Sequence, residues 1–234
     1  MPAYRRVLLT LVTVWLIAPA ALAAARWPQW WSWIAPEQTP MTWLQSVALV
    51  LAAALSLLVG YTLGHVGERP AGPWWLLSAG FAALAVDERF AVHERIRDSV
   101  LAPRGIAVPF LPWVAPGDFL LLAVGVAGLA LLPFVWRAFS LEPAARGPLI
   151  IGVLLASMAV AMDSIDPSTW TTDAERLEQT LEEVIEFGSG LALLASVTLC
   201  LLALLRTHLR TVSIGRPASG QDADAVGLRG DDGT

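Results

Sequence analysis

The sequence predicts an all-α protein, a polytopic bundle of six transmembrane helices. Of its 234 residues, 56% are hydrophobic and only 15% are charged, and the mean hydropathy is +0.61. Such a chain has too little polar surface to cover itself in water. The apolar residues also gather in runs long enough to cross a hydrocarbon core of about 30 Å. The solvent of this fold is therefore expected to be a lipid bilayer.

The first predicted span covers residues 7–25, after Arg5 and Arg6. Residues 21–23 also have the small-x-small form of a signal-peptide cleavage site, and cleavage there would leave five spans. The segment 27–43 is rich in tryptophan and broken by prolines, which suits the headgroup layer better than a regular helix. The second predicted span covers 43–64.

The third span is predicted over 74–94, with a helical extension that leaves the membrane and reaches Asp98. A proline-rich loop follows, expected at the membrane surface. The remaining predicted spans cover 119–137, 149–165 and 180–205. Residues 211–234 are polar and rich in glycine, which predicts a disordered cytoplasmic tail.

The arginines predict the orientation. All fifteen basic residues are arginine, which is typical of GC-rich bacterial genes, so we expect the bacterial cytoplasmic membrane. With six spans, most arginines fall on one side, which the positive-inside rule assigns to the cytoplasm together with both termini; they are Arg5, Arg6, Arg69, Arg137, Arg146, Arg206, Arg210 and Arg216. A net charge of −5 without a basic surface argues against a nucleic-acid partner. The single Cys200 excludes an internal disulfide and a cysteine-rich zinc site.

This orientation brings three acidic segments to the outer leaflet: the end of the third span, Asp163 in the fifth, and the start of the sixth helix. At about 100° per residue, four acids of the sixth helix share one face, while Glu183 points elsewhere; the four are Glu175, Glu178, Glu182 and Glu186. Small residues at 188–190 would let the third span approach this face. On the third span, Asp87 and Glu94 are in line, His93 lies to one side, and Glu88 lies on the other side with Arg95.

Three interpretations of this cluster stay open. In the first, the cluster is a structural ion-pair network in which Glu88, Glu182 and Glu186 are neutralised by arginines of the third span, because unpaired charges inside a membrane are costly; those arginines are Arg89, Arg95 and Arg97. In the second, it binds a divalent metal such as Zn²⁺, Mn²⁺ or iron through carboxylates and one imidazole; the donors would be Asp87, His93, Glu94, Asp163, Glu182 and Glu186. Glu94 or Glu183 would then be the general base of a metal-dependent hydrolase. In the third, it belongs to an ion or proton pathway, although no comparable acid lies in the inner half of any span.

Two strings carry a resemblance to known families. Residues 85–95, AVDERFAVHER, and residues 181–186, LEEVIE, resemble the L-D-E-x4-H-E motif and the paired-glutamate helix of uncharacterised bacterial multi-pass membrane proteins. The layout more distantly resembles the ceramidase-like membrane hydrolases, seven-helix proteins whose zinc is held by histidines and acids. That resemblance implies hydrolysis of a lipid or lipid-linked substrate that reaches the site sideways from the outer leaflet. Here Glu182 and Glu186 stand where that family has a histidine pair.

Overall fold

The computed structural model describes residues 3–67, 70–111, 113–114, 116–117, 119–165 and 170–214. All regular structure in these ranges is helical, which confirms the all-α prediction. Residues 211–214 of the predicted tail belong to the last helix, and the rest of that tail lies outside the described residues.

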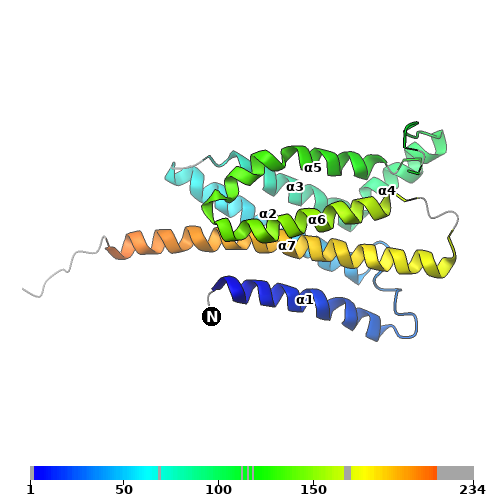
Figure 1. The fold of residues 1–234 in the computed structure, drawn as a ribbon, viewed down its shortest axis with the longest axis horizontal. Coiled ribbons are helices and arrows are strands. Elements are labelled where there is room, and N and C mark those ends of the chain that lie inside the picture. The colour runs from blue at the N-terminus through cyan, green and yellow to red at the C-terminus, as the bar shows by residue number, and fades with distance from the viewer. Residues whose placement is uncertain are drawn as a thin grey trace, which may run out of the picture.

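Six long helices lie side by side and run alternately up and down (Figure 1). They are α1 (Ala3–Ala25), α2 (Pro40–Val66), α3 (Gly72–Phe90), α5 (Phe119–Ala138), α6 (Arg146–Asp163) and α7 (Thr172–Ile214). The short α4 (Val92–Ile96), a π-helical turn (Arg97–Leu101) and a 3-10 turn (Ala102–Arg104) follow α3. Two more 3-10 turns, Phe139–Leu141 and Pro143–Ala145, join α5 to α6.

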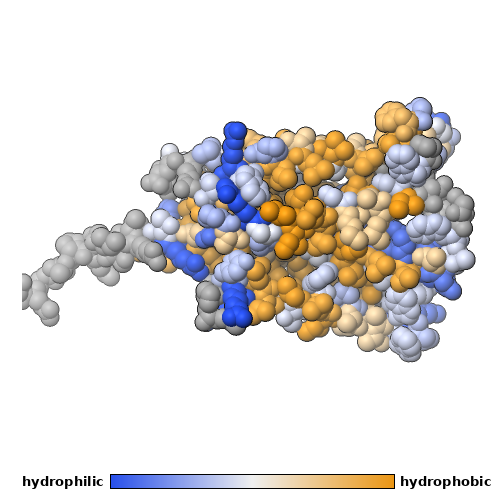
Figure 2. All heavy atoms as spheres, in the orientation of Figure 1, coloured by the Kyte–Doolittle hydropathy of each residue, from blue (hydrophilic) through white to orange (hydrophobic). Residues whose placement is uncertain are grey.

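Five of these helices are long and apolar enough to cross a membrane: α1, α2, α5, α6 and α7. The sixth, α3, falls outside this group because Asp87, Glu88 and Arg89 interrupt its apolar run in the last turn. On the face that Figure 2 shows, apolar side chains form a band across the middle of the molecule, with hydrophilic residues towards both ends. Large aliphatic residues such as Leu16 and Leu154 are more than half exposed. This distribution is consistent with a membrane protein.

The longest helix, α7, is the centre of the bundle and contacts α1, α2 and α6. Three side-chain hydrogen bonds join α7 to its neighbours and fix the rotation of α7 about its own axis. The Trp15 indole donates to the Val184 carbonyl at 2.8 Å, and the Gln45 amide donates to the Glu183 carbonyl at 3.0 Å. The Ser189 hydroxyl donates to the Gly152 carbonyl of α6 at 2.9 Å.

The small residues 188–190 of α7 pack against α1 and α2 and not against the predicted third span. A Cβ on Gly188 would lie 2.8 Å from the indole nitrogen of Trp15 in α1, and one on Gly190 would lie 3.8 Å from Ala48 in α2. The prediction that residues 188–190 admit the third span was therefore wrong. The reason is that α1 and α2 occupy this side of α7, while α3 packs against α2.

The predicted continuous helix from 74 to Asp98 was also wrong, because α3 ends at Phe90. Ala91 adopts the left-handed conformation, with φ 46° and ψ 51°, before α4 begins. The Asp87 carboxylate accepts hydrogen bonds from the backbone N–H and the Nδ1 of His93, each at 2.8 Å. The first bond satisfies a backbone donor that the break exposes, and the two together hold His93 beside Asp87.

Candidate metal centre in an acidic cavity

A cavity of about 1150 Å³ opens at one end of the bundle. This end contains the last turns of α3 and α6 and the connection between α1 and α2. Its walls come from α2 to α7, from the turns after α4, and from residues 35–37 of that connection. It reaches inward as far as Gly80 of α3, Leu131 of α5 and Leu193 of α7. The cavity therefore extends from the polar end of the molecule into its apolar band.

Carboxylates dominate the outer part of the lining. Within the described part of the chain, eleven acids line the cavity: Glu37, Asp87, Glu88, Glu94, Asp98, Asp163, Glu175, Glu178, Glu182, Glu183 and Glu186. Among the described residues that line it, the basic side chains are Arg97 and His93. So large an excess of acids needs protons or bound cations to offset it.

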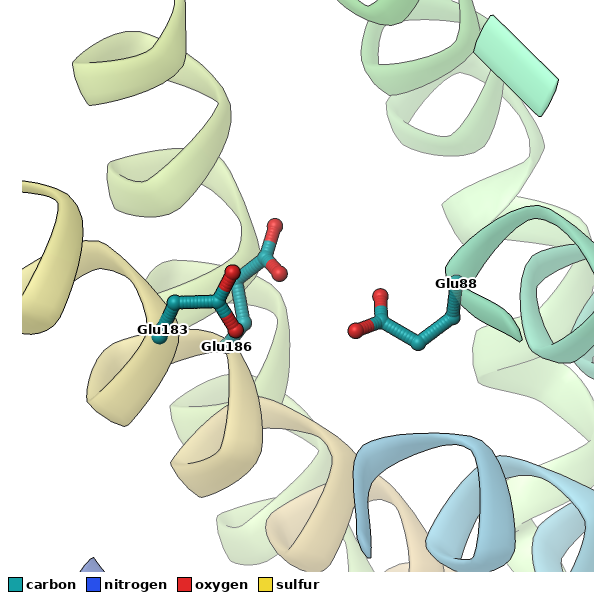
Figure 3. A group of neighbouring side chains, drawn as sticks. All are labelled: Glu88, Glu183 and Glu186. Carbon is teal, nitrogen blue, oxygen red and sulfur yellow. The ribbon is translucent and has the colours of Figure 1, made fainter. Parts of the chain in front are cut away.

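Three of these acids form a close group. Figure 3 shows Glu88 of α3 directed across the cavity towards Glu183 and Glu186 of α7. One carboxylate oxygen from each lies within 4.8 Å of the other two. Glu183 is only 6% exposed, and buried oxygens of Glu183 and Glu88 have no hydrogen-bond partner. A buried carboxylate oxygen without a partner is costly, so this geometry favours a bound cation.

A histidine–carboxylate pair lies beside this group. The Nδ1 of His93 is 2.8 Å from an Asp87 oxygen, and both side chains are about a quarter exposed or less. When Nδ1 donates to Asp87, Nε2 is left as the basic nitrogen of the imidazole. Glu94, next to His93, instead pairs with Arg97 at 2.9 Å.

Glu37 is a cavity residue that the sequence did not single out. It lies in the α1–α2 connection, where the Arg176 guanidinium of α7 stacks over Trp31 at 4.3 Å and Ile34 is buried. Burial, together with the negative charge of Glu94 and against the opposing effect of His93, raises the pKa of Glu37 to about 7. An isolated glutamate in a tryptophan-rich segment gives no sequence signal for this position.

The structure places all six predicted metal donors along the cavity, but only Glu186 belongs to the close group. Its two partners, Glu88 and Glu183, were predicted for other roles. The expectation that Glu183 points away from the acidic face was wrong. It lies about 60° from Glu186 around the helix, and a cavity this wide receives an arc of long glutamate side chains.

The predicted arginine partners are mostly elsewhere. Among the described residues, Arg89 and Arg95 are exposed and belong to no ion pair. Arg97 lines the cavity and pairs with Glu94 and with Asp98, the latter at 2.8 Å. In the part of the chain that the structure describes, no ion pair joins Glu182 or Glu186 to Arg89, which is exposed before the break at Ala91, or to Arg95, which is exposed after it.

Comparisons with known proteins place the chain in a family. No curated protein and no solved structure matches it, so the resemblance to ceramidase-like hydrolases stays a prediction. A family model described as "Domain of unknown function (DUF8692)" matches residues 6–210. These residues include nearly all of the six long helices and every acid of the cavity. The chain belongs to this family.

Proposed function

We propose that this protein is a six-span membrane protein that binds a divalent cation at Glu88, Glu183 and Glu186, and that it hydrolyses a lipid or lipid-linked substrate there. The observation that carries the proposal is the meeting of three carboxylates from α3 and α7 within 4.8 Å. At that separation and an effective dielectric constant of about 20, two carboxylates repel by about 3.5 kcal/mol. A divalent cation removes this repulsion and gives the unpartnered oxygens a ligand.

The donor set suits some metals better than others. Carboxylate oxygens are the preferred ligands of Mg²⁺, Ca²⁺ and Mn²⁺, whereas structural zinc sites more often include nitrogen or sulfur. Among Zn²⁺, Mn²⁺ and iron, the close group of three glutamates therefore fits Mn²⁺ best.

Hydrolysis needs a base as well as a metal. The cation would polarise a carbonyl or phosphoryl oxygen and activate a water molecule. His93 lines the same cavity and its Nδ1 is held by Asp87, so its Nε2 is the base that we propose. Glu94 is paired with Arg97 and Glu183 belongs to the cation group, so we revise the two bases expected from the sequence.

We propose α3 as the sixth span. It lies among the other five long helices (Figure 1), and Asp87 and Glu88 line the cavity, which removes them from lipid. The termini would then be cytoplasmic, the cavity would face the outer leaflet, and the membrane would be the bacterial inner one. Reporter fusions after Arg146 should report the cytoplasm, and fusions after Arg104 and Thr171 the outside. A cytoplasmic report from residue 104 would refute this topology.

Metal content tests the cation site. Protein purified without chelator should carry a divalent transition metal near one equivalent, and EPR-monitored titration should show one tight Mn²⁺ site. Glu88→Gln and Glu186→Gln should weaken Mn²⁺ binding by at least about tenfold, because each removes a charged ligand. The matched control is Asp173→Asn, which removes one charge from α7 at a side chain 95% exposed. Equal Mn²⁺ affinity in all four proteins would overturn the proposal.

The pair Arg97–Glu94 supports a second candidate, a structural ion network without a metal. In that case the purified protein is metal-free, and both Glu94→Ala and Arg97→Ala destabilise it, the second more because Arg97 also pairs with Asp98. The double charge swap, Glu94→Arg with Arg97→Glu, would then restore only part of the lost unfolding midpoint, because the new glutamate at position 97 lies beside Asp98. Under the metal proposal, Mn²⁺ raises the unfolding midpoint of the charge-swapped protein no more than it raises that of wild type.

A further inference from the structure

We infer that the inner part of the cavity holds the alkyl chain of a lipid whose head group is positively charged. This inference rests on the proposed function, because it names the substrate class of the same site. It depends on the shape of the cavity, on two glycines that face open space, and on the balance of charge in the lining.

The inner part of the cavity, here called the apolar arm, has aliphatic walls from four helices: Leu84 of α3, Val124 and Leu131 of α5, Val153 of α6 and Leu193 of α7. Along α5 the lining runs from Leu121 to Leu131, a rise of about 15 Å. An elongated space with aliphatic walls suits an unbranched hydrocarbon chain.

Two glycines show that the arm is open rather than filled by side chains. Gly80 of α3 and Gly128 of α5 both line the cavity, and a Cβ added at either would meet nothing within 4 Å. Gly125, one turn earlier on α5, is different, because a Cβ there would touch Val160 of α6 at 3.4 Å. The helix therefore packs on α6 at Gly125 and leaves space beside Gly128.

The charge of the lining selects the head group. Even with His93 protonated, one divalent cation, Arg97 and His93 offset at most four of the eleven acids, so the others need protons or a further cation. A positively charged head group adds to that offset, whereas a phosphate or carboxylate head would be repelled wherever it did not bind the cation directly. The acids outside the close group, such as Glu178 and Glu182, line the same cavity and are the partners we expect for an amine.

The test compares two amphiphiles with one chain. Mn²⁺-loaded protein in phosphatidylcholine nanodiscs is titrated with labelled dodecylamine and, separately, with dodecyl phosphate. Wild type should bind the amine at least about tenfold more tightly. Gly80→Leu and Gly128→Leu fill the arm and should weaken amine binding by about tenfold, the usual scale of an overpacked site. Their Mn²⁺ affinity should stay at the wild-type value.

Gly147→Leu is the matched control. A Cβ at Gly147 also meets nothing within 4 Å, but this residue lies at the start of α6, at the other end of the bundle from the acids. It should bind both Mn²⁺ and dodecylamine like wild type. Unfolding midpoints of all three glycine variants identify any that fails to fold, and the remaining arm variant then carries the test.

The outcomes separate the two proposals. If the arm variants bind Mn²⁺ and dodecylamine like wild type, the chain site is refuted while the cation site stands. Tighter binding of dodecyl phosphate than of the amine would refute the choice of head group. Absence of Mn²⁺ binding in wild type, combined with amine binding that both arm variants weaken, would refute the cation site and leave the chain site supported.

Discussion

The substitution Glu186→Gln removes one negative charge from the close group without changing the shape of the side chain. Glu186 has two carboxylate neighbours, Glu88 and Glu183, within 4.8 Å. With no cation bound, full ionisation would cost about 7 kcal/mol for this residue, from two repulsions of about 3.5 kcal/mol. Protonation of Glu186 removes both of these repulsions, and at pH 7 it costs about 4 kcal/mol for a glutamate with an ordinary pKa. This cost is the upper limit on the free energy of unfolding that Glu186→Gln can add.

The sign of the effect should therefore depend on the metal. In chelator, Glu186→Gln should unfold at a higher temperature than wild type, by a free energy of up to about 4 kcal/mol. In excess Mn²⁺, wild type gains about 2.7 kcal/mol at a hundred times the dissociation constant, and the variant gains little because it has lost a ligand. The assay is thermal unfolding in detergent micelles, followed by circular dichroism, with Asp173→Asn as the control.

Two results would refute this reasoning. A lower midpoint for Glu186→Gln in chelator would mean that the carboxylate has a stabilising partner in the metal-free protein. An equal rise with Mn²⁺ in wild type and variant would mean that the metal binds elsewhere. Asp173→Asn should follow wild type under both conditions, since its exposed pair with Arg176 at 3.4 Å contributes little.

Three further substitutions test the surroundings of the site by their unfolding midpoints. Burial raises the pKa of Glu37 to about 7 from 4.5, so the folded state retains a proton that the unfolded state loses, and stability should fall as pH rises through that window; Glu37→Gln should flatten this slope, and an unchanged slope would contradict the assignment. Gly152→Ala should cost about 1–3 kcal/mol, because its Cβ would lie 2.7 Å from Leu193 Cγ, and a neutral result would contradict the close approach of α6 and α7. Ala91→Gly should add about 1 kcal/mol by relieving the left-handed conformation at φ 46°, whereas a loss would indicate a regular helix there.

The helices were predictable because their signals are local. The expected bounds 119–137 and 149–165 lie within three residues of α5 and α6, since apolar runs and the glycines and prolines beside them mark both ends. The acids were predictable as one group for a related reason. A charge within an apolar helix has to face inward, so alternating spans bring such residues to one cavity.

What the sequence could not show depends on tertiary contacts. No glycine or proline marks the end of α3, and the break forms at Ala91, a residue 3% exposed that is an ordinary helix former. A helical wheel also considers only the angle of each residue around the helix axis and neglects the length of its side chain. The width of the cavity and the length of a glutamate side chain let Glu183 reach the group that its angle excluded.

The break at Ala91 explains the spacing of the D-E-x4-H-E string. In a continuous helix, residues 87 and 93 would be about 9 Å apart along the axis and about 120° apart around it, too far for their side chains to meet. With Ala91 in the left-handed conformation, His93 instead lies at 2.8 Å from Asp87 through both its backbone and its ring. The D-E part of the motif therefore ends α3 and the H-E part begins α4, on opposite sides of the break. Glu88 faces the α7 carboxylates and His93 lines the same cavity, so under the proposed hydrolysis this four-residue spacing would supply both a cation ligand and the base.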